Sequence, residues 1–281
     1  MSSQLPSETY RHPAHSQWSA AGFRYPDRIV SHAQAWQHER LLASDVDPAC
    51  YGDIAEAGLF GLDCFAAMVE AGHDIDGYLF IDQTLVLERP PRLDEPLVLS
   101  GQVDRLVPVR RGLLAEETYR LRDQAGALCI ETRLRGIVAP LPADVATNAL
   151  EPMPARSPVP ADGWIQIESK QLTPEKVRAF SEDVGNDLHF DPVAARAYGF
   201  RAPLAQGVMS VVYLLGALAT QAPARRMNVH IEFLRPVFWD SPVTLWQHGI
   251  AGDSGGRRVV QSRNESGKAT ANLIASTLSY A

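Results

Sequence analysis

The sequence has little cysteine, and its few cysteines are far apart. Its 281 residues include three, Cys50, Cys64 and Cys129, without a CxxC pair or the His/Cys spacing of zinc ligands. This excludes a disulfide framework and a cysteine-based zinc site, and it is typical of a reducing compartment. We therefore expect a cytoplasmic protein, and the sequence indicates neither a metal nor a redox cofactor.

Concentrated positive charge and long apolar runs are also lacking. The formal net charge is -7, and basic residues occur as short pairs such as Arg110 with Arg111, so nucleic acid is not an expected partner. Residues 1–17 lack the apolar core of a secretory signal. The longest apolar run, 204–219, is shorter than the roughly 18 residues of a membrane span and contains Gln206. We interpret it as a buried helix and expect no membrane span.

A proline-rich stretch divides the chain. Residues 140–160, "PLPADVATNALEPMPARSPVP", contain six prolines, each of which removes a backbone donor and disfavours helix at the residue before it. No period-2 alternation accompanies the prolines, which favours a linker over an edge strand. The predicted organisation is an N-terminal half at 1–139, a linker at 140–162 and a C-terminal half at 163–281.

The two halves contain matching motifs at an offset of 146 residues. "ERPPRLDEPLVL" (88–99) aligns with "LRPVFWDSPVTL" (234–245), and both read Arg-Pro, three residues, Asp, one residue, Pro, then alternating apolar positions. The same offset places "GLDCFAAMVEAG" (61–72) over "GVMSVVYLLGAL" (207–218), so that Gly61 matches Gly207. Two matches at one spacing predict an internal duplication.

Each half is predicted to contain one apolar helix followed by about four strands. The strand segments show period-2 alternation and β-branched or aromatic enrichment. They are "YLFIDQTLVLE", "LVLSGQVDRLV", "GLLAEETYRLRD" and "ALCIETRLRGIVA", and then "MNVHIEFLRPV", "VTLWQHGIA", "GRRVVQSRN" and "ATANLIASTLSY". An antiparallel sheet wrapped around its helix would bury that helix on most faces, as the apolar composition of 207–219 requires. The predicted fold class is therefore α+β.

Residues 172–219 resemble the MaoC-like family of the hot-dog fold, which includes (R)-specific enoyl-CoA hydratases and (3R)-hydroxyacyl dehydratases. "NDLHFD", "YGFRAP" and "LAQGVM" are similar to the family's acidic loop, its "GF" step and the start of its central helix. Gln206 stands where the family usually has histidine. With the duplication, the resemblance implies a double hot-dog, two tandem sheets each wrapped around a central helix, in which one half keeps the site.

The acidic loop departs from the family pattern. Counting back from His189 by the family spacing places Asn186 on the motif's asparagine but Val184 where the catalytic aspartate is expected. Counting forward from Phe180 makes the loop about two residues short, which brings Asp183 or Asn186 to the aspartate's place. The sequence is compatible with both alignments.

The resemblance implies hydration of trans-2-enoyl thioesters, or dehydration of 3-hydroxyacyl thioesters, linked to coenzyme A or to a carrier protein. His189 is the first candidate, because imidazole can accept or give a proton near neutral pH. Asp183 can act as its carboxylate partner, whereas Asn186 can only orient water or substrate. Gly207 opens the second central helix, where free N–H groups can meet the thioester oxygen, and Arg201 can meet a phosphate.

The first half serves as an internal control. The 146-residue offset places Asn186 over Arg40 and His189 over Ala43, so no histidine occupies the matching position, although His38 is close in sequence. We expect this half to supply cavity wall, leaving one site per chain, and such chains can pair further as homodimers.

Two other functions stay open. Hot-dog proteins also hydrolyse acyl thioesters with a carboxylate on the central helix, and the only helix of the two with such residues carries Asp63 and Glu70. Asp63 lies in the first turn, where the helix dipole alone favours an acidic residue. The other alternative is a non-catalytic protein that binds acyl thioesters, which the altered acidic loop favours.

Overall fold

The computed structural model describes residues 18–76, 78–140, 149–181, 185–219, 222–248 and 258–280. The candidate Asp183 lies outside the described residues. Within these ranges no helix has the length and apolar character needed to cross a membrane.

The strands form one ten-stranded sheet in which every neighbouring pair is antiparallel. They are β1 (Arg24–Val30), β2 (Leu79–Leu87), β3 (Leu97–Val109), β4 (Gly112–Arg122), β5 (Leu128–Ala139), β6 (Ile165–Gln171), β7 (Arg226–Phe233), β8 (Pro242–His248), β9 (Arg258–Asn264) and β10 (Ala269–Ser279). Their order is β1-β3-β4-β5-β2-β7-β10-β9-β8-β6. Read from its own edge inward, each half has the same strand order, so the arrangement repeats.

The two halves join where β2 pairs with β7. Thr84 lies opposite His230, which is 146 residues further along the chain, and Thr84 Oγ1 is 3.2 Å from His230 Nδ1. Each of these residues therefore faces its own counterpart under the 146-residue offset, as expected at a pseudo-twofold axis. The strands expected around each helix are present, and the two sets meet edge to edge in a continuous sheet.

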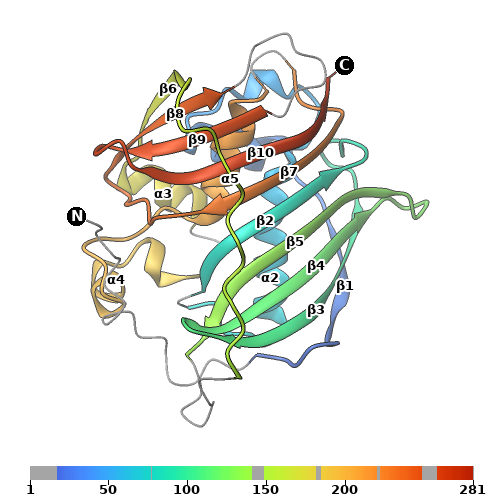
Figure 1. Cartoon of the computed structure of the whole chain (residues 1–281). Helices are drawn as coiled ribbons and strands as arrows, with labels where there is room; N and C mark the ends of the chain where they lie inside the picture. Colours follow the sequence, from blue (N-terminus) through green and yellow to red (C-terminus); the bar gives the residue numbers. More distant parts are fainter. Residues whose placement is uncertain are drawn as a thin grey trace.

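Helices α2 (Phe60–Glu70) and α5 (Gly207–Gly216) lie behind the sheet in Figure 1, one in each half. The α5 side chains from Val208 to Leu214 are almost completely buried, which confirms the buried helix expected from the apolar run. Full burial of one large aliphatic side chain stabilises the fold by about 1.5–3 kcal/mol. Packing, more than helix propensity, therefore holds α5 in place.

The two edge strands were not expected from the sequence. β1 has the burial pattern eBeeieB and β6 has eeeieBe, so neither shows the regular alternation of a half-buried strand. Each pairs on one side only, β1 with β3 and β6 with β8. Because an edge strand buries few side chains, its sequence carries little periodic signal.

The described residues between β5 and β6 cross the face of the sheet opposite α2 and α5 (Figure 1). Glu151 N donates to Pro108 O at 2.8 Å, and Ser157 N donates to Glu232 Oε1 at 2.6 Å. Between them, the Arg156 guanidinium donates to the carbonyl oxygens of Ile81 and Phe233. This crossing segment, residues 149–163, is thus hydrogen bonded to both halves.

Candidate active site

The loop before α5 is built from two short capped turns. It follows α3 (Pro174–Ser181), which is in contact with α1 (Gln34–Ala43) of the first half. Asn186 caps the 3-10 turn η5 (Asp187–His189), and Asp191 caps α4 (Pro192–Ala197) by accepting from Val193 N at 2.7 Å. Each of these side chains satisfies a backbone N–H group at the start of its turn, as is usual for Asn and Asp at such positions.

His189 ends η5 and is only 8% exposed. Its Nδ1 is 2.9 Å from the carbonyl oxygen of Leu204. A carbonyl oxygen only accepts hydrogen bonds, so Nδ1 carries the proton and Nε2 keeps its lone pair. Burial lowers the pKa of His189 to about 4, against the smaller raising effect of the Leu204 bond. At neutral pH His189 is therefore an uncharged base.

Asn186 is buried beside His189, and both of its amide atoms are hydrogen bonded to backbone. Its Nδ2 donates to Ile75 O of the first half at 3.0 Å, and its Oδ1 accepts from Leu188 N at 3.0 Å. The side chain does not line the cavity that His189 faces. Its observed contacts orient the loop that carries His189.

Gly207 begins α5, and the ring of Phe80 from β2 lies against it. A Cβ at position 207 would be 2.5 Å from Phe80 Cδ1, which explains the absence of a side chain. Gln206, the preceding residue, makes no side-chain cap, and its Oε1 is buried without a partner among the described residues. The first-turn N–H groups of α5 therefore donate no hydrogen bond to the Gln206 side chain.

His189, Gly207 and Arg201 line one cavity of about 260 Å³. Its wall includes Tyr78 and Phe80 from the first half, so the two halves build it together. Among the described residues, no aspartate or glutamate lines it. Its charged residues are instead four arginines, at positions 111, 156, 201 and 235.

Arg201 has its charge compensated within the protein. Its Nη1 and Nη2 donate to the two carboxylate oxygens of Asp240 at 2.9 and 2.8 Å, and Nη2 also donates to Ser241 Oγ at 3.0 Å. The guanidinium also lies over the ring of Phe238, 4.0 Å from its centroid. Arg201 thus lines the cavity as one partner of a bidentate ion pair.

Comparisons with known proteins bear on the fold. No protein-family model and no curated protein sequence matches this chain. Among solved structures, a MaoC-like dehydratase matches with a TM-score of 0.73 and 13% identity, over 94% of this chain and 99% of that one. RV0216, a conserved hypothetical protein from Mycobacterium tuberculosis with a double hotdog fold, matches with a TM-score of 0.60 and 15% identity, over 92% and 96%.

The fold is a double hot-dog. Its structural neighbours also include an acyl-ACP thioesterase from Bacteroides thetaiotaomicron, with a TM-score of 0.56 and 9% identity over 89% of this chain and 96% of that one. The fold expected from the sequence is confirmed, while identities this low leave the activity to be argued from the cavity.

The double hot-dog also has a counterpart of this cavity in its first half. A pocket of about 30 Å³ lies where residues 51–57, the end of β2 and the start of β7 meet. These elements correspond to the loop before α5, the end of β7 and the start of β2 around the larger cavity. The helix walls differ, because the small pocket contacts the end of α5 at Leu215 and the larger cavity contacts its start at Gly207. The first-half counterpart is therefore nearly filled.

The constant offset of 146 fails in the loop before each central helix. Asp47 caps the 3-10 turn η1 (Pro48–Cys50) by accepting from Ala49 N, just as Asn186 caps η5. By this local match, Cys50 rather than Ala43 corresponds to His189. The second half contains the additional helix α4 between this turn and α5, which shifts the alignment. The first half still offers no histidine at the matching position.

Asp63 lies in the first turn of α2, as expected, but it does not line the large cavity. Its Oδ2 is 2.8 Å from Nε2 of His32, whose ring stacks on Phe60. Asp63 is therefore part of a separate His–Asp pair in the first half.

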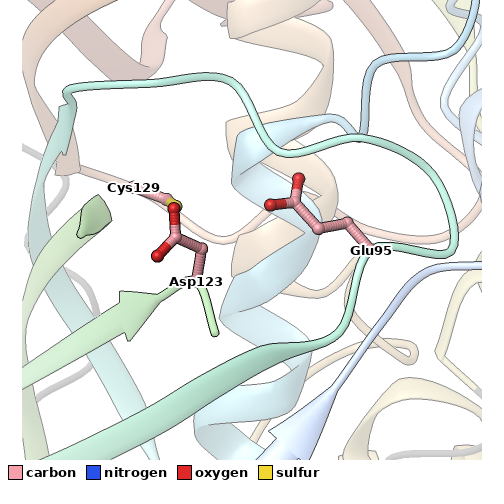
Figure 2. A group of neighbouring side chains, drawn as sticks. All are labelled: Glu95, Asp123 and Cys129. Carbon is pink, nitrogen blue, oxygen red and sulfur yellow. The ribbon is translucent and has the colours of Figure 1, made fainter. Parts of the chain in front are cut away.

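One group of side chains has the composition of a metal site. Glu95, Asp123 and Cys129 converge in the first half (Figure 2). However, Nη2 of Arg89 is 2.5 Å from Glu95 Oε1, 3.3 Å from Asp123 Oδ2 and 2.9 Å from Cys129 Sγ. The guanidinium supplies the positive charge that a metal ion would otherwise bring to these carboxylates, so they do not form a fitting metal site here.

Proposed function

We propose that this protein hydrates trans-2-enoyl thioesters, or dehydrates 3-hydroxyacyl thioesters, with His189 as the acid/base. The observation that carries the proposal is a buried neutral imidazole with a free Nε2 lone pair, in the same cavity as the start of the central helix. The dehydratases among the structural neighbours use the same fold and support the reaction class.

The reaction requires a base for water and an acid for the α-carbon. In hydration, Nε2 takes a proton from water while the water oxygen bonds to C3. The displaced electron pair moves through C2 toward the thioester oxygen, and the imidazolium returns its proton to C2. Nδ1–H bonded to Leu204 keeps the correct nitrogen facing the cavity throughout.

The remaining candidates take supporting roles in the proposal. N–H groups at the start of α5, next to Gly207, stabilise the charge on the thioester oxygen. Asn186 positions His189 through its two backbone bonds. Asp183 is the proposed carboxylate partner that orients the water.

Thioester hydrolysis is the second candidate, because the Asp63–His32 pair is a carboxylate on a central helix beside an imidazole. That pair lies outside the large cavity, which favours hydration. The two reactions differ in their products, since only hydrolysis releases a free thiol.

The test is incubation with crotonyl-CoA while loss of the enoyl thioester and release of thiol are followed together. We expect enoyl loss without thiol. His189→Ala should lower the rate by about 10²–10⁴-fold, the usual contribution of a general acid/base. His38→Ala, which removes an exposed histidine from α1, is the matched control and should keep the wild-type rate. Thiol release would favour hydrolysis, and no change in either signal would favour the binding-protein alternative.

A further inference from the structure

The two repeats of the Arg-Pro motif place their arginines in equivalent backbone positions. The N–H of Arg89 donates to Cys129 O at 3.3 Å, and the N–H of Arg235 donates to Thr270 O at 3.1 Å. In each half the arginine therefore follows the strand at the pseudo-twofold axis, β2 or β7. Their side chains have different surroundings.

Arg89 is surrounded by groups that carry or can carry negative charge. Figure 2 shows the side chains of Glu95, Asp123 and Cys129 that its guanidinium contacts. The bond with Glu95 raises the pKa of Arg89 and lowers that of the Glu95 carboxyl. The charge of Arg89 is therefore satisfied inside the first half.

In the second half each of these three groups is replaced by a residue that does not ionise. The motif places Ser241 at the position of Glu95, and the backbone bond just described places Thr270 at that of Cys129. Asn264 takes the place of Asp123. Asp123 Oδ1 accepts two backbone bonds of 3.0 and 2.9 Å in its turn, and Asn264 Oδ1 accepts two of 3.1 and 3.0 Å.

Arg235 consequently has no carboxylate partner among the described residues. Its Nη1 donates to the carbonyl oxygen of Ala269 at 2.6 Å, which orients the side chain but leaves its charge uncompensated. The residue lines the large cavity. Two carboxylates of the same half are engaged elsewhere, Asp240 with Arg201 and Glu232 with Ser157 N.

Two further cations face the same cavity. Arg156 of the crossing segment donates only to backbone carbonyls, so its charge is also uncompensated. Arg111, at the tip of the β3–β4 hairpin, is exposed and has no hydrogen bond or ion pair within the described part of the chain. Three separate segments thus contribute one available guanidinium each.

We propose that Arg235, Arg156 and Arg111 form the phosphate-binding site of this cavity, and that the thioester it takes is carried on coenzyme A. Guanidinium groups bind phosphate in a bidentate manner. A carrier-protein arm has one phosphodiester, whereas coenzyme A has a diphosphate and a further phosphate, which suits three cations. This inference rests on the proposed thioester chemistry for its substrate class.

The test compares Arg235→Gln, Arg156→Gln and Arg111→Gln with the wild type on three crotonyl thioesters. On crotonyl-CoA we expect Arg235→Gln to raise KM about tenfold, with kcat within twofold. Crotonyl-pantetheine, which has no phosphate, should be turned over equally well by all forms. A similar rise in KM on crotonyl-pantetheine would overturn the proposal. So would an unchanged KM on crotonyl-CoA in all three variants. Wild-type preference for the crotonyl carrier protein would overturn the choice of coenzyme A.

Arg89→Gln is the matched control from the first half. It should leave KM for crotonyl-CoA unchanged while lowering the melting temperature, because Glu95 and Asp123 lose their common cation. Asn264→Asp is the reciprocal change. It preserves the acceptor of the turn but offers Arg235 the carboxylate that Arg89 has, so KM should rise severalfold at unchanged stability.

Binding of free coenzyme A by calorimetry separates this inference from the proposed function. Measured in His189→Ala, it does not depend on turnover. Weaker binding after Arg235→Gln would support the phosphate site even if no hydration occurred. Equal affinity for coenzyme A in His189→Ala and in the double variant His189→Ala/Arg235→Gln would overturn the site even if hydration were confirmed.

Discussion

The two halves of this double hot-dog share a strand order but differ at the start of the central helix. Before α5 the chain forms η5 and α4, and a cavity of about 260 Å³ follows. Before α2 it passes through η1 and the 3-10 turn η2 (Ala57–Leu59) without an intervening α-helix, and the corresponding pocket is about 30 Å³. Both halves therefore have the same strand order, whereas the loop before the central helix differs between them.

The halves also differ in the buried ionisable group that each contains and in its surroundings. The second half presents His189 to a cavity, whereas the first half buries Glu117 among Tyr25, Tyr119 and other aromatic residues. Burial lowers the pKa of His189 to about 4 and raises that of Glu117 to about 7. Desolvation therefore shifts both groups toward their neutral forms, acting on opposite charges.

The largest expected effect is the acid sensitivity that His189 causes. Its folded-state pKa lies below the unfolded value, so its contribution to stability is complete above about pH 6.5 and is lost as pH falls toward 4. The shift corresponds to about 3 kcal/mol. The difference in free energy of unfolding between wild type and His189→Gln, measured by urea at several pH values, should change by this amount. A constant difference would contradict the assigned burial.

Glu117 should show the opposite dependence in the first half. Its folded-state pKa is raised, mainly by burial, so its stabilising contribution is present below about pH 4.5 and is lost as pH rises through 7. We expect Glu117→Gln to gain on the wild type by about 2–3 kcal/mol between pH 4.5 and 8. Urea unfolding of both proteins measures it, and a difference that falls with rising pH would refute this explanation.

A smaller effect should separate the two glycines that begin the central helices. A Cβ at 207 would be 2.5 Å from Phe80 Cδ1, whereas a Cβ at 61 would be 3.0 Å from Val208 Cγ2. Gly207→Ala should cost about 1–3 kcal/mol through overpacking and should displace the Phe80 ring that lines the cavity. Gly61→Ala should cost less, because alanine favours helix and its contact is milder. Thermal unfolding and crotonyl-CoA turnover of both variants provide the test. Equal losses of stability in the two variants would show that the contact with Phe80 adds no cost at position 207.

Much of the fold could be predicted because the sequence patterns that indicate its helices and strands are local. Apolar composition indicated α5, period-2 patterns indicated eight of the strands, and the repeated Arg-Pro motif revealed the duplication. The edge strands β1 and β6 escaped detection because a strand paired on one side buries too few residues to show a pattern.

The cavity was predictable only in part. His189, Gly207 and Arg201 line it together, but one of the two backbone bonds of Asn186 is made to Ile75, which is 111 residues away. Tyr78 and Phe80 reach the cavity through the pairing of β2 with β7, which no local pattern specifies. The free charge of Arg235 could have been predicted from the repeat, because the alignment that matches Arg235 with Arg89 places Ser241 over Glu95.

The most direct test of the account is the rate of crotonyl-CoA hydration by wild type, His189→Ala and Cys50→Ala, the last changing the local counterpart of His189. We expect His189→Ala to lose at least a hundredfold in rate while Cys50→Ala remains within twofold of the wild type. Hydration that survives in His189→Ala, or that depends equally on Cys50, would contradict a single site in the second half.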